Sequence, residues 1–281
     1  MPRKIHIALL LCDTPIPAVR QAHGTYLDIF RTHLLASLPA AQATKARGEE
    51  IELVLDGYQV TEGKLPSIDS FEQGKEGAYE GLMITGSAHC SFDDKKNPWV
   101  RPTFEFIKKV GDEASHIKII GICFGLQLIT RAYGGKVVKN PAGWEIGTYE
   151  VQLNELGQKV FKTPTVNIQQ MHSDYAPALP PSGDLQVLGS TERSPIQGFV
   201  KFNDSETGSE NRKEEQKIHI LGFQGHPEFH PSIVQKIIDA RSSTGLFTPE
   251  MTVEARDRAD RPHDGLTTLG GVMWDVLLGD A

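Results

Sequence analysis

The residues best suited to chemistry in this sequence are a cysteine between two glycines and a histidine with a glutamate two positions later. Cys123 lies in the stretch GICFGLQLIT, after the apolar run that ends at Ile122 and before a predicted helix. The start of that helix would direct free N–H groups and the positive end of its dipole at the sulfur, which favours the thiolate. The glycines allow a strained turn and a close approach by a substrate. The pattern predicts a nucleophile, although an isolated cysteine is more commonly a small buried residue.

The histidine and the glutamate belong to the stretch GFQGHPEFH. His226 and Glu228 lie on either side of Pro227, which excludes the interior of a helix. In an extended chain, alternate residues point the same way, so the carboxylate can lie beside the imidazole. It would orient this base and stabilise its protonated form, as in the triads that activate a nucleophile. Alone, each residue would be an ordinary surface residue. Together with the glycine-flanked cysteine, the two residues indicate a catalytic site far more specifically than either does alone.

The elements that must position these residues alternate between strands and helices in the first half of the chain. Strands are predicted at 4–12, 49–58, 77–86 and 116–123, and helices at 21–38, 102–114 and 125–135. This alternation predicts βαβ units and an α/β fold with a mostly parallel sheet covered by helices on both faces. Loops 86–98 and 121–125 would then meet at the carboxyl edge of the sheet.

The second half of the chain has a different pattern. Strand-like segments follow one another with little helix between them, at 144–153, 165–174, 185–192, 196–202 and 217–229. They predict antiparallel strands added to the same sheet. The polar, charged stretch 203–217 is expected to be a solvated loop. We expect one domain over residues 1–243, with a helix at 231–243, and a helical C-terminal extension over 244–281 packed on that domain.

Composition limits the kinds of partner. The 281 residues carry a formal charge of −7 and no basic run, which argues against nucleic acid and acidic membranes. The three cysteines have neither paired nor metal-like spacing, which favours a reducing compartment. No stretch approaches the roughly 18 apolar residues of a membrane span, and the apolar N-terminal run lacks a cleavage site. We expect a cytoplasmic protein that needs no metal or organic cofactor.

The motifs resemble a known family. GICFGLQ and GHPEF look like the nucleophile and base motifs of the class I, triad-type glutamine amidotransferases, whose fold is flavodoxin-like. The stretch LMITGSAHCSFDD (82–94) resembles the family's glycine loop facing the nucleophile. QMHSDYAPALP (170–180) resembles a segment of GMP-synthetase glutaminase domains. Similarity runs from about residue 4 to 240, and GWEIGTYEV (143–151) is most like the free-standing fungal members and the plant γ-glutamyl peptidases.

The resemblance implies a catalytic triad and an acyl-transfer reaction. Cys123 would be the nucleophile, His226 the base and Glu228 its orienting partner. The thiolate would attack a γ-glutamyl carbonyl, and a thioester would then be hydrolysed to glutamate.

The resemblance also implies roles for residues around the triad. The backbone amides of Gly86 and Phe124 would form an oxyanion hole, which contributes on the order of 3 kcal/mol per donor. Gln127 and His172 would line the pocket of the glutamyl group, although for His172 a structural, hydrogen-bonded role is equally expected. The sequence departs from the common family pattern at Ser87, where many relatives have a glycine.

Three functions remain open on the sequence alone. The first is a free-standing hydrolase of glutamine or of a γ-glutamyl peptide. The second is a glutaminase subunit that supplies ammonia to a separate synthase, since the chain has no P-loop or adenylation module of its own. The third is a catalytically idle binding or regulatory protein with the same fold, against which the intact triad argues.

Overall fold

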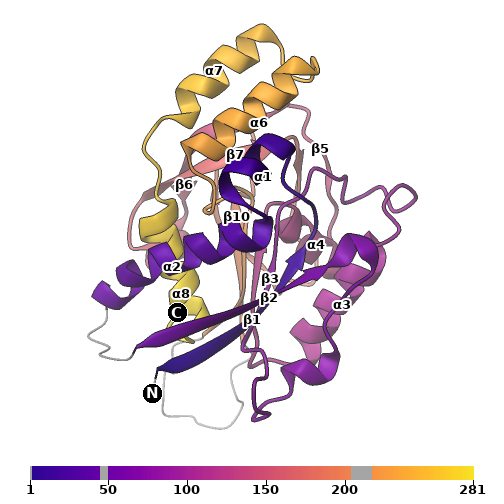
Figure 1. The fold of residues 1–281 in the computed structure, drawn as a ribbon, viewed down its shortest axis with the longest axis vertical. Coiled ribbons are helices and arrows are strands. Elements are labelled where there is room, and N and C mark those ends of the chain that lie inside the picture. Colours follow the sequence, from indigo (N-terminus) through magenta and orange to yellow (C-terminus); the bar gives the residue numbers. More distant parts are fainter. Residues whose placement is uncertain (1, 45–49, 204–216) are drawn as a thin grey trace.

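The computed structural model describes residues 2–44, 50–203 and 217–281 (Figure 1). Its strands are β1 (Arg3–Leu11), β2 (Ile51–Gln59), β3 (Gly81–Ile84), β4 (Lys118–Ile122), β5 (Val138–Lys139), β6 (Glu145–Leu153), β7 (Thr165–His172), β8 (Asp174–Tyr175), β9 (Gln186–Ser190), β10 (Gly198–Phe202) and β11 (Ile218–Phe223). Nine of them form one sheet in the order β2-β1-β3-β4-β11-β10-β9-β6-β7. The pairs from β2 to β11 are parallel, and those from β11 to β7 are antiparallel.

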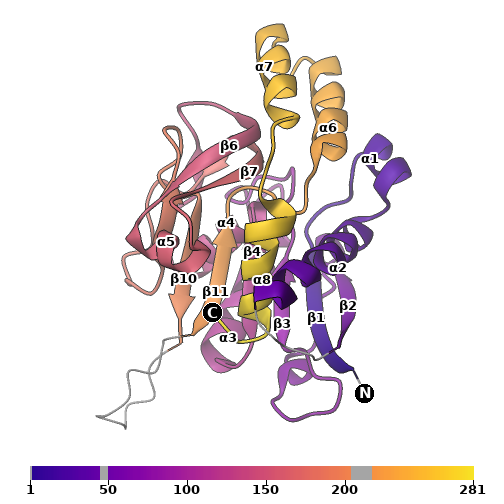
Figure 2. The same cartoon turned by 90° about the vertical axis from the view of Figure 1, so that its left-hand side faces the viewer.

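The helices follow the predicted alternation. They are α1 (Pro17–His23), α2 (Tyr26–Thr44), α3 (Val100–Glu113), α4 (Phe124–Ala132), α5 (Glu155–Phe161), α6 (Pro231–Ser243), α7 (Pro249–Ala259) and α8 (Gly270–Leu277), with short turns η1 (Val60–Glu62), η2 (Ile68–Phe71) and the π-helical η3 (Gly265–Leu269). Figure 2 shows α2 and α8 in front of the sheet and α3 behind it. The predicted α/β fold with a mostly parallel sheet, helices on both faces and added antiparallel strands is therefore confirmed.

The central parallel strands are largely apolar on both faces because both faces are covered, whereas the edge strand β2 is partly exposed. In β1, Ile7 and Leu9 pack with the side chains of α2 and α8, whereas Ala8 and Leu10 pack with those of α3 and α4. This is the alternation of a pleated strand, with each face buried under a different helical layer. The two hydrophobic cores hold the strands in place on both faces of the sheet. The site lies at the ends of these strands.

The prediction of a single helix at 21–38 is wrong, because the helix is interrupted at Gly24. Gly24 has φ of 80°, and the backbone N–H and hydroxyl of Thr25 both donate to the Asp28 carboxylate at 2.8 and 2.6 Å. These bonds start a new helix, so α1 and α2 meet at an angle. The seven-residue α5 was not predicted. Its first turn is capped by the Asn154 side chain, which accepts a bond from the N–H of Gly157 at 2.8 Å.

The antiparallel half of the sheet curls back toward the parallel half. The edge strand β7 makes an isolated bridge with His226, which lies shortly after the end of β11: the N–H of His226 donates to the carbonyl of Gln169 at 2.8 Å. The curl brings the end of β7 beside the carboxyl ends of β4 and β11. Segments more than fifty residues apart in the sequence therefore meet at one edge.

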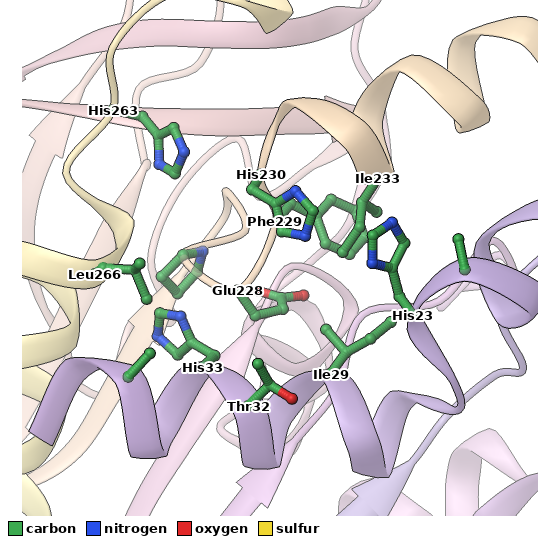
Figure 3. A pocket seen from close by; sticks show the side chains of 13 residues that line it. His23, Ile29, Thr32, His33, Glu228, Phe229, His230, Ile233, His263 and Leu266 are labelled. Atoms are coloured by element: carbon green, nitrogen blue, oxygen red, sulfur yellow. The ribbon is translucent and has the colours of Figure 1, made fainter.

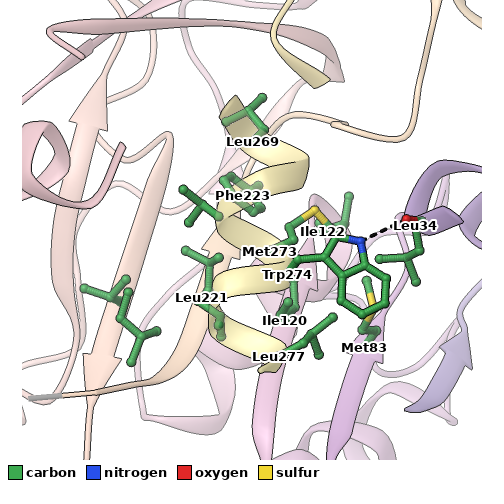
Figure 4. Close-up of a cluster of buried hydrophobic side chains, with 14 of the residues drawn as sticks. Leu34, Met83, Ile120, Ile122, Leu221, Phe223, Leu269, Met273, Trp274 and Leu277 are labelled. Atoms are coloured by element: carbon green, nitrogen blue, oxygen red, sulfur yellow. Dashed lines mark hydrogen bonds between the residues drawn. The ribbon is translucent and has the colours of Figure 1, made fainter. Parts of the chain in front are cut away.

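The C-terminal segment contributes to the main core. Trp274 of α8 is completely buried, and its indole N–H donates to the carbonyl of Leu34 at 2.9 Å (Figure 4). Around it lie Met83, Ile120 and Leu221 from three strands of the sheet. The charged stretch expected to be a loop, 203–217, falls almost wholly outside the described residues. No described helix is long and apolar enough to cross a membrane.

Candidate active site

Cys123 occupies a sharp turn between β4 and α4. Its φ of 52° and ψ of −99° are unusual for a residue with a side chain. The turn is held by the Cys123 N–H, which donates to the carbonyl of Phe223 at 2.6 Å. The two neighbouring glycines are required by close packing, since a Cβ on Gly121 would lie 2.7 Å from the backbone of Gly125, and one on Gly125 would lie 2.6 Å from the carbonyl of Ile84.

His226 and Glu228 lie next to this turn. Nδ1 of His226 is 2.8 Å from Oε1 of Glu228, and both the imidazole and the Cys123 side chain face Gly86. The ring of Phe229 stacks on the imidazole, with centroids 4.1 Å apart and planes within 6°. The Cys123, His226 and Glu228 side chains are nearly completely buried. The structure thus brings together the three residues predicted as the triad.

The surroundings of His226 determine its protonation. Burial lowers the pKa of His226, but the interactions with Glu228 and Cys123 raise it by a larger amount. The resulting pKa is about 10. At neutral pH the imidazole is therefore protonated and can act as a proton donor beside Cys123.

The two residues predicted for the oxyanion hole, Phe124 and Gly86, both border the turn at Cys123. Phe124 is the first residue of α4, so its N–H has no acceptor within the helix. Gly86 faces the turn so closely that a Cβ on it would lie 2.6 Å from Cε1 of His226 and 3.6 Å from Cβ of Cys123. A side chain at position 86 would therefore displace the imidazole.

The loop that contains Gly86 is fastened on both sides. The Asp13 carboxylate accepts a bond from the N–H of Ala88 at 2.7 Å and one from the Ser87 hydroxyl at 3.3 Å. Farther along the loop, Asp94 forms a two-pronged ion pair with Arg131 of α4, at 2.6 and 3.0 Å. These contacts hold the loop next to the turn at Cys123.

Gln127 and His172 are both close to this region and both engaged with protein groups. The Gln127 carboxamide accepts from the Ser91 hydroxyl and donates to the carbonyl of Asp174, each at 3.0 Å. His172 has Nδ1 at 3.1 Å from the carbonyl of Asp174 and Nε2 at 3.0 Å from the carboxylate of Glu145. Gln127 thus ties the loop facing the nucleophile to the end of β7, and His172 belongs to a buried polar network.

Gln224 is a residue of the site that the sequence analysis did not single out. It is fully buried, and its Nε2 donates to Sγ of Cys123 at 3.6 Å, while its Oε1 has no partner among the described residues. Gln224 lies two residues before His226, so in extended chain both side chains point to the same face. The two-residue spacing from His226 was the sequence signal from which Gln224 could have been identified.

A cavity of about 400 Å³ lies behind the triad (Figure 3). Four histidines from separate segments line it together with the triad glutamate: His23, His33, His230, His263 and Glu228. Oε2 of Glu228 and Nε2 of His33 are buried there without a hydrogen-bond partner among the described residues. Even so, no described group of three or more histidine, cysteine or acidic side chains has the geometry to hold a metal ion.

The fold and this site define a class of protein, and comparison with known families agrees. The model of the family "Glutamine amidotransferase class-I" matches residues 57–240. The chain belongs to that family. The resemblance inferred from the two motifs is confirmed.

Individual relatives extend the similarity over nearly the whole chain. A glutamine amidotransferase-like protein of Schizosaccharomyces pombe is 34% identical over 92% of this chain and 93% of its own length. Gamma-glutamyl peptidase 2 of Arabidopsis thaliana is 27% identical over 85% of this chain and 82% of its own. A glutamine amidotransferase of Thermotoga maritima has the same fold, with a TM-score of 0.62 at 18% identity over 97% of this chain and 98% of that one.

Proposed function

We propose that the protein hydrolyses γ-glutamyl amide bonds, in glutamine or a γ-glutamyl peptide, through a thioester on Cys123. The observation that carries the proposal is the 2.8 Å contact of the His226 imidazole with Glu228 beside Cys123, which lies at a strained turn that starts a helix. Membership of the amidotransferase family and the similarity to plant gamma-glutamyl peptidases support the same substrate class.

In the first half of the reaction, the Cys123 thiolate attacks the γ-carbonyl carbon and forms a carbon–sulfur bond. The N–H groups of Gly86 and Phe124 stabilise the oxyanion of the tetrahedral intermediate. The carbon–nitrogen bond breaks as the protonated His226 gives its proton to the leaving amine. Glu228 stabilises the imidazolium before this step.

In the second half, neutral His226 takes a proton from a water molecule that attacks the thioester. The carbon–sulfur bond breaks, glutamate leaves, and the thiolate and imidazolium are restored. The nearby amide of Gln224 donates to the sulfur at 3.6 Å and would stabilise the charge that returns there. No other reactant is consumed.

The test measures glutamate released from glutamine, glutathione and a γ-glutamyl dipeptide by the wild type and by Cys123→Ser. We expect release from at least one substrate and a loss of at least about 10³-fold in the variant. The matched control is Cys90→Ser, because Cys90 is a partly buried cysteine of the facing loop outside the triad. Equal rates for wild type and Cys123→Ser would remove Cys123 from its role.

The same measurement separates the free-standing hydrolase from a glutaminase that serves a partner. Faster release from peptides than from glutamine would support a peptidase. Weak release from glutamine alone would favour a glutaminase subunit that depends on a separate synthase. No release from any substrate by the folded protein would contradict the free-standing hydrolase.

A further inference from the structure

A narrow pocket adjoins the triad on the side of His226, separate from the cavity behind Glu228. Residues of the facing loop, α2, β7 and α6 line it, among them Tyr26, Ser87, Ala88, Met171, His226 and Arg241. Because His226 gives its proton to the leaving amine, the leaving group must lie on this side of the scissile bond. The residues of the pocket are therefore placed to contact the leaving group.

Arg241 is the cationic group of this pocket, and aromatic rings hold it. Its guanidinium carbon lies 5.0 Å from the centroid of the Trp144 ring and 5.8 Å from that of Phe247. The two rings form an edge-to-face pair at 5.2 Å. The turn after α6 fixes this arrangement, since the N–H of Leu246 donates to the Arg241 carbonyl at 3.0 Å. An arginine in the last turn of a helix usually reaches into water, but this one is partly buried.

Within the described part of the chain, Arg241 contacts the two rings and lies close enough to Tyr26, Cys123 and Asp13 to interact with them electrostatically, but no carboxylate pairs with it directly. Nη1 is buried without a hydrogen-bond partner, and no described carboxylate forms an ion pair with the guanidinium. The carboxylate of Asp13, in the same pocket, is occupied with the N–H groups of Thr14 and Ala88. A buried guanidinium donor without a partner is costly, and a bound carboxylate would satisfy it in the two-pronged geometry that arginine favours.

We propose that Arg241 binds a carboxylate on the leaving group, so that the preferred substrates are γ-glutamyl peptides with a free C-terminal carboxylate. This inference rests on the proposed hydrolysis of γ-glutamyl bonds and adds the identity of the leaving group. Glutamine, whose leaving group is ammonia, makes no use of the residue. Arg241 thereby determines specificity and takes no part in the bond-breaking steps.

The first experiment compares free-acid and amide forms of the same substrates. Values of kcat/KM are measured for γ-glutamylalanine and its C-terminal amide, and for glutathione and its glycinamide form. We expect the wild type to prefer the acid of at least one pair by about 10- to 100-fold in kcat/KM, and Arg241→Met to lose that preference. Arg241→Lys keeps the positive charge but lacks the planar guanidinium that can donate two parallel hydrogen bonds. It should retain part of the preference for the acid.

The matched control is Arg256→Met, since Arg256 is an exposed arginine of α7 that pairs with Asp239. It should retain the acid preference in full. An acid preference that is absent from the wild type, or that survives in Arg241→Met, would overturn the proposal.

A second experiment does not depend on turnover. Binding of the acid and amide peptides to Cys123→Ala, with and without Arg241→Met, is measured by calorimetry. Tighter binding of an acid that disappears with Arg241→Met supports the carboxylate subsite even if the wild type cleaves nothing, in which case only the proposed hydrolysis fails. Equal binding of acid and amide in both proteins contradicts the subsite whatever the rates of cleavage.

Discussion

At the scale of single residues, Cys123 has a backbone conformation that costs about 1–3 kcal/mol in a residue with a side chain. The hydrogen bond to Phe223 and the contact between Gly121 and Gly125 hold it there. The strained turn places Cys123 beside Gly86, next to His226. The same crowding makes Gly86 a sensitive position.

Replacement of Gly86 by alanine should strongly reduce catalysis and leave the folded structure in place. The new methyl group would lie 2.6 Å from Cε1 of His226, so the imidazole must move away from the sulfur. We expect kcat/KM for a γ-glutamyl peptide to fall by at least about 100-fold. The control is Gly271→Ala, where the added Cβ meets nothing within 4 Å. A Gly86→Ala protein with wild-type kcat/KM would show that this contact is not needed.

The pH dependence of the reaction should reflect the ion pair of His226. Burial lowers the pKa of His226, but Glu228 and Cys123 raise it to about 10, so the proton donor persists through neutral pH. We expect kcat/KM to decline only as the pH approaches 10. Glu228→Gln removes one of the charges that raise the pKa and should move this decline to lower pH. The profile of kcat/KM between pH 5 and 11 tests this, and an unchanged alkaline limb in Glu228→Gln would contradict it.

This shift also has a consequence for stability. The pKa of His226 is higher in the folded protein than the value of about 6.5 in an unfolded chain. Its contribution to the free energy of unfolding is therefore complete below about pH 6.5 and disappears as the pH rises to about 10.

At the scale of elements, α2 carries a histidine that should make the protein sensitive to acid. His33 lies in the cavity behind the triad, and burial, together with the nearby His263, lowers its pKa to about 4. Between pH 6.5 and 4 the unfolded chain binds a proton that the folded protein does not, so stability falls as the pH falls through this range.

His33→Leu should reduce this acid sensitivity. The loss in free energy of unfolding between pH 7 and pH 4.5 should be smaller than in the wild type by about 2–3 kcal/mol. Urea denaturation at the two pH values measures it. The same loss in both proteins would mean that His33 is not the group responsible.

The sequence predicted the elements whose patterns are local. Continuous apolar runs identified the buried parallel strands, and Cys123, His226 and Glu228 were found because glycines and a proline mark their turns. The break at Gly24 was missed, since the apolar periodicity continues across it and the cap depends on one bond pattern, from Thr25 to Asp28. Arg241 was not singled out, because its position depends on the ring of Trp144 from a distant segment as well as on that of Phe247 in the turn after its own helix.

At the scale of the whole molecule, the site depends on contacts between distant parts of the chain. The curl of the antiparallel strands brings Gln169 to His226, and α8 covers the same face of the sheet as α2. Neither arrangement follows from local pattern, because each is a pairing across more than fifty residues. The last helix thus supports the strands that end at the triad.

Trp274→Ala should destabilise the whole protein. The indole is completely buried between α2 and the sheet and donates to the carbonyl of Leu34, so its removal leaves both a cavity and an unpaired acceptor (Figure 4). We expect a loss of about 3–5 kcal/mol in free energy of unfolding and a fall in Tm of about 10 °C. Val253→Ala, on the exposed face of α7, should change stability by no more than about 0.5 kcal/mol. A Trp274→Ala protein as stable as this control would contradict a central role for α8.

The most direct test of the account is capture of the thioester. Wild-type protein mixed with a γ-glutamyl peptide is quenched in acid within the first turnover, and its intact mass and peptide masses are measured. We expect a mass increase of one glutamyl group on the peptide that contains Cys123. This increase should be absent from the Cys123→Ser protein and present in the Cys90→Ser protein. Release of glutamate by the wild type with no such adduct, or with an adduct on another residue, would contradict the proposed mechanism.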